Sequence, residues 1–67
     1  MIVYDPFWET IQKKHISTYA LIHSYNVSSS TISRLRNNQG INTNTINDLC
    51  KMLKCDVSDI LKYIAED

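Results

Sequence analysis

The sequence predicts an all-α domain of five short helices packed around one core. After Tyr4, the apolar residues recur with the period of a helix and not with the alternation of a strand. A helix-start pattern then recurs four times, in which a capping residue lies between two apolar residues five positions apart. Finally, 67 residues with 43% hydrophobic content are enough for one domain, residues 1–67, with one core.

The first helix is predicted over residues 5–14. Asp5 is expected to accept hydrogen bonds from the first free N–H groups, and Pro6 suits the first helical position, where no N–H is needed. The apolar stripe of this helix consists of Phe7, Trp8 and Ile11. Trp8 is interpreted as a core anchor and not as a residue that stacks on a ligand. Lys13 and Lys14 suit the negative end of the helix.

Residues 1–4 form a short apolar run that contains β-branched side chains. Three interpretations are open for this run: a loose terminus, a cover over the core, or a strand that pairs with another chain. The first two are favoured for a monomer.

Four further helix starts follow from the recurring pattern, which is that of the hydrophobic staple. The capping residues are Ser17, Ser28, Asn42 and Asp56, and their apolar neighbours are Ile16 and Leu21, Val27 and Ile32, Ile41 and Ile46, and Cys55 and Ile60. They predict helices over about residues 18–25, 29–37, 43–53 and 57–65. The side chains expected to point inward are Leu21, Ile22, Tyr25, Ile32, Leu35, Ile46, Leu49, Cys50, Leu53, Ile60, Leu61 and Ile64.

The second and third helices form the predicted functional motif, over about residues 17–38. Only Asn26 and Val27 separate the end of one helix from the cap of the next, so the two helices are expected to cross steeply. Asn26 is expected to have a positive φ, which asparagine tolerates best after glycine. Such a helix-turn-helix places its second helix in the major groove of DNA.

If Ile32 and Leu35 are buried, the outer face of the third helix carries small and donor-rich side chains. Arg34 can donate two hydrogen bonds to a guanine edge. The predicted base-contacting residues are Ser29, Ser30, Ser33 and Arg34, and the predicted phosphate-contacting residues are Ser17, Thr18, Ser28, Arg36 and Asn37. The alternative is an ordinary solvated helix face. For Ser28 the capping role is preferred, and for Arg34 base contact is preferred over solvation.

Charge is distributed unevenly along a chain whose formal net charge is zero. Every acidic residue lies at or before Glu9 or at or after Asp48. The segment between them contains Lys13, Lys14, Arg34 and Arg36, a local charge of +4. A neutral protein with such a basic middle can still meet phosphate groups on one face.

Residues 16–38 resemble the Cro/cI-type (XRE-like) helix-turn-helix family of phage-repressor-like regulators, most specifically in VSSSTISRLR. The resemblance continues through INTNTINDLCKMLKCDVSDIL, and it is greatest to a branch of very small regulators. It implies a five-helix, lambda-repressor-like fold and a DNA-binding transcriptional regulator, with repression as the expected activity. It also implies a homodimer on an inverted repeat. By this resemblance, Ser29, Ser30 and Arg34 match base-reading positions, and Thr18 and Asn37 match phosphate-contacting positions.

A second hypothesis is a protein-interaction module on the same scaffold, antitoxin-like or adaptor-like. The neutral net charge and the small basic patch favour it, and the apolar N-terminal run and Tyr63 are its candidate contacts. An enzyme is the weakest hypothesis, because His15 and His23 have no partner at a catalytic spacing and one glycine cannot make a phosphate loop.

The remaining sequence features indicate no cofactor. Cys50 and Cys55 are interpreted as small hydrophobic residues, since a metal site needs about four ligands and only two distant histidines could complete it. A redox switch is a minor alternative. There is no secretory signal pattern, no membrane-length apolar run and no evident small-molecule site, so the expected setting is the cytoplasm and the expected partner is double-stranded DNA.

Overall fold

The computed structural model describes residues 1–66. The helices are α1 (Asp5–Lys13), α2 (Thr18–His23), α3 (Ser29–Arg36) and α4 (Thr43–Leu53), followed by the 3-10 turn η1 (Val57–Asp59); the strands are β1 (Ile2–Val3) and β2 (Lys62–Tyr63). Within these described residues, no helix is both long enough and apolar enough to cross a membrane.

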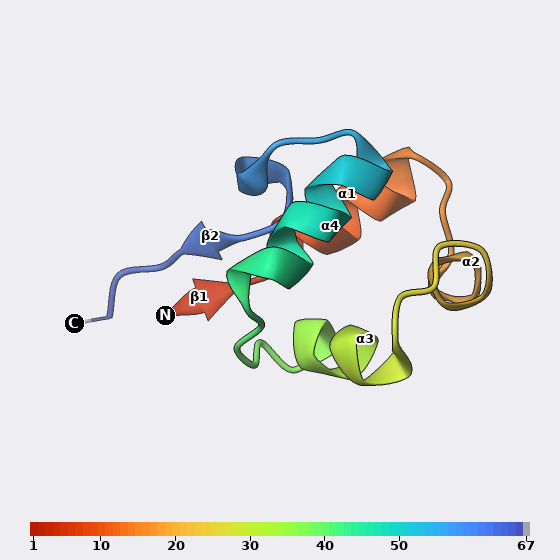
Figure 1. Ribbon diagram of the computed structural model, residues 1–67. Coiled ribbons are helices and arrows are strands. Elements are labelled where there is room, and N and C mark those ends of the chain that lie inside the picture. Colours follow the sequence, from red (N-terminus) through yellow and green to blue (C-terminus); the bar gives the residue numbers. More distant parts are fainter. Residues whose placement is uncertain (67) are drawn as a thin grey trace.

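Figure 1 shows how the helices surround the core. The helices α1 and α4 occupy the centre, α3 runs along the lower side, and α2 stands at the far end from the strands. In this view α2 is seen end-on while α3 is seen from the side (Figure 1). The two helices of the predicted motif therefore cross steeply, as their short connection predicts.

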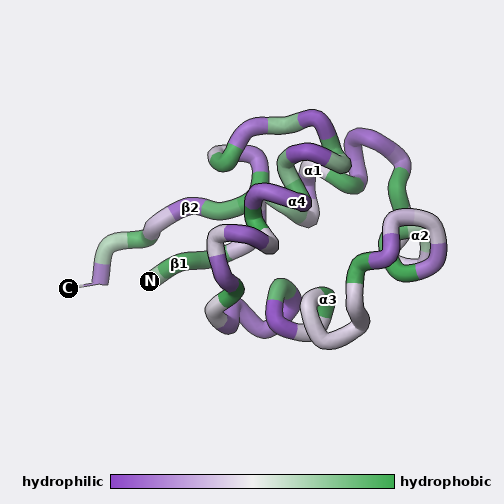
Figure 2. Tube along the Cα trace, in the orientation of Figure 1, coloured by the Kyte–Doolittle hydropathy of each residue, from purple (hydrophilic) through white to green (hydrophobic). Residues whose placement is uncertain are grey.

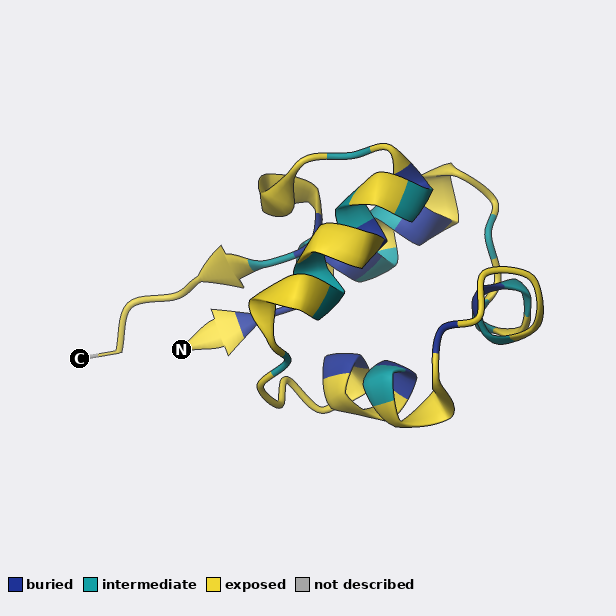
Figure 3. Ribbon diagram, viewed as in Figure 1, coloured by how far each residue is buried: buried dark blue, intermediate teal, exposed yellow. Residues whose placement is uncertain are grey.

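Each α-helix contributes at least one side chain to the core, and so does Ile60, the residue that follows η1. The buried members of the core are Tyr4, Phe7, Ile11, Leu21, Val27, Ile32, Leu35, Leu49, Leu53 and Ile60. In Figure 3 the buried positions of α3 face the other helices and its opposite side is exposed. Four side chains expected to point inward are only half-buried: Ile22, Ile46, Cys50 and Leu61. Tyr25, also expected to point inward, is exposed. Tyr25 lies beyond the end of α2, where the chain has already turned toward α3.

The four predicted capping residues all act as caps. The side chains of Ser17, Ser28 and Asn42 accept hydrogen bonds from the backbone N–H three residues later. Asp56 forms a reciprocal capping box with Asp59. The prediction for α1 is wrong in one detail, because Asp5 is itself the first helical residue. The residue before it is Tyr4, whose side chain makes no capping bond.

Left-handed residues end the helices, and none of them is glycine. Positive φ values occur at His15, Asn26, Asn38 and Lys54, and the value for Asn26 is 59°, as predicted. The N–H of Ile16 donates to the carbonyl of Ile11 at 2.9 Å, which closes α1 in a Schellman motif around His15. Each such residue reverses the chain sharply, which keeps the connections between helices short.

The predicted fifth helix is wrong. After η1 the chain becomes extended, and β2 pairs with β1 in antiparallel register, Ile2 with Tyr63 and Val3 with Lys62. The N–H of Ile64 donates to the carbonyl of Met1 at 2.8 Å, which extends the pairing. Ile60 is buried as expected, but Ile64 is exposed. Strand pairing with the first residues of the chain thus replaces the last two turns of the expected helix.

The two strands leave the helices side by side and carry apolar side chains into solvent. Figure 2 shows β1 as hydrophobic along its length. Only Val3 is buried there, and the exposed large hydrophobic side chains of the sheet are Met1, Ile2, Tyr63 and Ile64. The N-terminal run is therefore an intramolecular strand, and only its inner end covers the core.

Candidate nucleic-acid interface

The start of α3 is fixed by Ser28. Its Oγ accepts a hydrogen bond from the N–H of Thr31 at 3.1 Å and lies 2.9 Å from the Thr31 hydroxyl. The preferred capping role of Ser28 is thus confirmed. Because the hydroxyl is engaged at the helix start, a phosphate contact by Ser28 would have to share it.

The side of α3 that faces away from the core consists of Ser29, Ser30, Ser33, Arg34 and Asn37, and we call these five residues the outer face of α3. All five are exposed. On the opposite side, Ile32 and Leu35 are buried in the core. The structure therefore brings the four predicted base-contacting residues together on one surface, with two serines in the first turn of α3.

Arg34 is held at one edge of this surface. Its Nη1 donates to the carbonyl oxygen of Gly40 at 3.3 Å. An open hollow lies beside it, lined by Ser30, Ser33, Arg34, Gln39 and Gly40. Since a guanidinium has five N–H donors, the bond to Gly40 leaves enough of them for a bidentate contact to a guanine edge.

Asn37 folds back on its own helix. Its Nδ2 donates to the Ser33 carbonyl at 2.9 Å and lies 3.4 Å from the Ser33 hydroxyl. The same carbonyl also accepts the backbone N–H of Asn37 at 3.0 Å, so the side chain adds a second hydrogen bond to this oxygen at the end of α3. A phosphate contact by Asn37 would compete with this bond.

Arg36 is placed differently from the outer face, on the flank of α3 next to α1. Its guanidinium carbon lies 5.4 Å from the centroid of the Trp8 ring, a cation–π distance. Trp8 in turn packs edge-on against Phe7, with 5.0 Å between centroids. Trp8 therefore packs on the core, as predicted, and also supports an exposed cation. The sequence offers no spacing signal for this pair, because the two residues lie on different helices.

The predicted phosphate contacts of α2 lie at its start. Ser17 accepts from the N–H of Ala20 at 3.0 Å, and Thr18 is the half-buried first residue of the helix. Further along, the rings of Tyr19 and His23 stack on the exposed side, with 4.1 Å between centroids. Sequence reasoning missed this pair, although its spacing of four residues on a helix could have indicated it.

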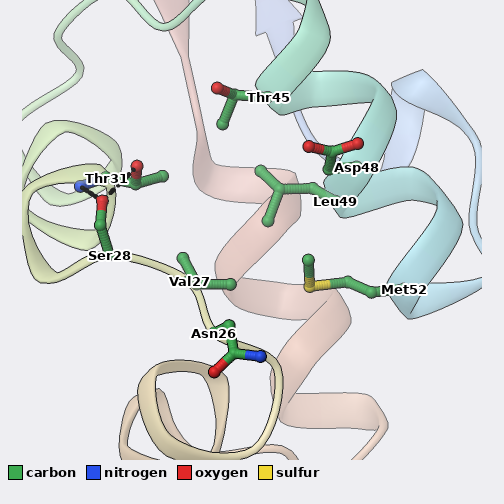
Figure 4. A pocket seen from close by; sticks show the side chains of 8 residues that line it. All are labelled: Asn26, Val27, Ser28, Thr31, Thr45, Asp48, Leu49 and Met52. Carbon is green, nitrogen blue, oxygen red and sulfur yellow. Dashed lines mark hydrogen bonds between the residues drawn. The ribbon is translucent and has the colours of Figure 1, made fainter.

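A second hollow lies behind the start of α3, between the turn and α4. Its volume is about 230 Å³. Val27 from the turn and Leu49 and Met52 from α4 face one another across it (Figure 4). Polar side chains of the turn and helices form the rest of its lining. Val27 and Leu49 are buried and belong to the core, so the turn and α4 both contribute to the core beside this hollow.

The two cysteines are free thiols, half-buried beside the core. Burial raises the pKa of the Cys55 thiol, and neighbouring Cys50 and Asp59 raise it further. Within residues 1–66, no three histidine, cysteine or acidic side chains are grouped so that they could hold a metal ion. The raised pKa of Cys55 means that the folded chain favours the neutral form of this thiol.

Comparison with known proteins agrees with this geometry. Residues 7–66 match the model of the Cro/C1-type HTH DNA-binding domain. The structure is similar to the crystal structure of the transcriptional regulator VanUg, with a TM-score of 0.86 and 25% sequence identity over 97% of this chain and 87% of that chain. No curated protein sequence matches. The chain belongs to the family of Cro/C1-type helix-turn-helix DNA-binding domains.

Proposed function

We propose that this protein is a transcriptional repressor that binds a specific DNA sequence by inserting α3 into the major groove. The observation that carries the proposal is the outer face of α3, where small hydroxyl side chains and one arginine share an exposed, acid-free surface. Small side chains let a helix approach base edges closely, and the arginine can identify a guanine. The similarity to a transcriptional regulator supports this role.

The proposed contacts divide into two groups. Ser29, Ser30, Ser33 and Arg34 contact base edges. Ser17, Thr18, Ser28, Arg36 and Asn37 contact phosphates on either side of the groove, through side chains and helix N–H groups. Because Arg34 and Arg36 are the only cations of α3, few counterions are released, and we expect affinity to depend weakly on salt concentration.

A homodimer on an inverted repeat is part of the proposal. One copy presents a small contact surface with few cations, and two copies on one DNA molecule double it. In Figure 3 the two strands project sideways from the helices, whereas the exposed side of α3 faces the lower edge of the view. A two-fold contact through the exposed apolar side chains of the strands would leave both α3 helices accessible to DNA.

Selection of bound sequences from random double-stranded DNA tests the proposal. We expect an enriched palindromic sequence, with half-sites whose centres lie about one helical turn apart. Enrichment of a single half-site would support base recognition by a monomer. If no sequence is enriched at low salt, the proposed function is wrong.

An interaction module is the second candidate, and one observation favours it. Tyr63 and Ile64 are 68% and 44% exposed on a chain with zero net charge. Such side chains suit a protein contact better than a DNA contact. A stable complex with a protein partner, together with no enriched DNA sequence, would support this alternative.

A further inference from the structure

Tyr4 connects the N-terminal segment to the loop that follows α3. The residue is 3% exposed and is part of the core. Its backbone N–H donates to Oδ1 of Asn38 at 3.1 Å, and its hydroxyl donates to the carbonyl of Gln39 at 2.8 Å. Two bonds from one buried residue thus hold two consecutive loop residues that are far away in sequence.

The loop is also fixed from the side of α3. Asn38 has a φ of 55°, and the N–H of Gln39 donates to the carbonyl of Arg34 at 2.8 Å. This is the Schellman closure of a helix end. The path of residues 38–40 is therefore determined by α3 on one side and by Tyr4 on the other.

The loop held in this way forms one wall of the proposed DNA-contacting surface. Gln39 and Gly40 line the open hollow together with Ser30, Ser33 and Arg34. The carbonyl of Gly40 accepts the hydrogen bond from Nη1 of Arg34. A chain of contacts thus runs from the Tyr4 hydroxyl through Gln39 and Gly40 to the guanidinium of Arg34.

We propose that Tyr4 is a positioning residue for Arg34: it holds the loop whose Gly40 carbonyl orients the guanidinium toward the groove. The inference rests on the proposed function, since it concerns the residue proposed to identify a guanine. An arginine whose guanidinium group is already ordered in the free protein loses less side-chain entropy when it contacts the base. Tyr4 itself is buried and does not touch DNA.

The substitution Tyr4→Phe removes the hydroxyl and keeps the ring in the core. We expect it to weaken binding to the selected DNA site about two- to tenfold. In the Arg34→Ala background the same substitution should cause no further loss, because there is no guanidinium left to position. Tyr19→Phe, at an exposed tyrosine on α2, is the matched control. Equal losses from Tyr4→Phe in both backgrounds would indicate a merely structural role and overturn the proposal.

A measurement without DNA separates this proposal from the proposed function. Nitrogen-15 relaxation of the Arg34 side chain reports how far the guanidinium is ordered in the free protein. We expect greater mobility of this group in Tyr4→Phe and no change in Tyr19→Phe. Asn38→Gly is the second variant, since it keeps the positive φ and removes the acceptor for the Tyr4 N–H. Unchanged Arg34 mobility in both Tyr4→Phe and Asn38→Gly would overturn the inference, whereas failure to select any DNA sequence would overturn the function alone.

Discussion

The guanidinium group of Arg36 lies over the indole ring of Trp8, 5.4 Å from its centroid. This contact joins the end of α3 to the start of α1, and it holds a cation beside the outer face of α3. The ring keeps the cation near the surface, and the charge remains exposed to solvent. The pair therefore has a structural and an electrostatic consequence, which two variants of Arg36 separate.

We expect Arg36→Ala to lower the free energy of unfolding by about 0.5–1 kcal/mol, because an exposed cation–π contact is lost. It should also weaken DNA binding about equally for all sequences, and lower the slope of log affinity against log salt by about one. Urea denaturation and salt titrations measure these effects. Arg36→Lys is the control, since it keeps the charge and should retain the salt slope. A change in sequence preference in Arg36→Ala would contradict the assignment to phosphate.

Arg34→Ala should weaken binding to the selected site by about 1–3 kcal/mol, the value of a bidentate contact to a base. Its bond to Gly40 is exposed, so the unfolding transition should change little. Discrimination at one base pair of each half-site should be lost. Lys51→Ala on α4 removes the same charge away from α3 and serves as the control. Equal losses in the two variants would show that Arg34 acts only through its charge.

Local patterns of the sequence predicted the helix starts and the outer face of α3 correctly. The four capping side chains form hydrogen bonds within the first turn of the element that each precedes; they are Ser17, Ser28, Asn42 and Asp56. Neighbouring residues therefore determine where each of these elements begins. The exposure of α3 follows from its helical period in the same way. Both kinds of prediction depend only on residues within a few positions of one another.

The cap of α1 is a local error, whereas the other errors concern contacts between distant parts of the chain. Ile60, Leu61 and Ile64 have helical spacing, yet the segment is extended because it pairs with Ile2–Val3 at the other end of the chain. Short apolar runs do not distinguish a helix from a strand. The bonds of Tyr4 to the loop span up to 35 residues, and the Trp8–Arg36 contact joins two helices. No local pattern reports such partners.

The left-handed conformation of Lys54 predicts a stabilising substitution. Its φ is 53° at the end of α4, a conformation that costs a non-glycine residue about 1 kcal/mol. Lys54→Gly removes this conformational cost, but glycine also adds freedom to the unfolded chain, which offsets part of the gain. We therefore expect the substitution to raise the free energy of unfolding by about 0.5–1 kcal/mol. Lys51→Gly, inside α4, should lower it by about 1 kcal/mol. Urea denaturation compares both, and destabilisation by Lys54→Gly would contradict the argument.

The exposed sheet predicts the effect of a charge on self-association. Tyr63→Glu places a carboxylate on the surface proposed for the two-fold contact. We expect the variant to sediment as a monomer at concentrations where the natural sequence sediments as a dimer, because a charge in an apolar contact is costly to desolvate. Tyr19→Glu, at an exposed tyrosine on α2, should leave the dimer intact. If the natural sequence sediments as a monomer at high concentration, without DNA and with it, the dimer is wrong.

The raised pKa of Cys55 predicts how stability changes at alkaline pH. Burial is the main cause, and Cys50 and Asp59 add to it. The folded chain therefore holds this proton more tightly than the unfolded chain does. The resulting stability is fully present below the unfolded-state pKa and is lost as the pH rises through the folded-state value. A comparison between variants isolates the contribution of this thiol. Between pH 7 and about pH 10, we expect the free energy of unfolding to fall further for the natural sequence than for Cys55→Ala. Urea denaturation at several pH values measures the difference, and an equal fall in both proteins would exclude a contribution from Cys55.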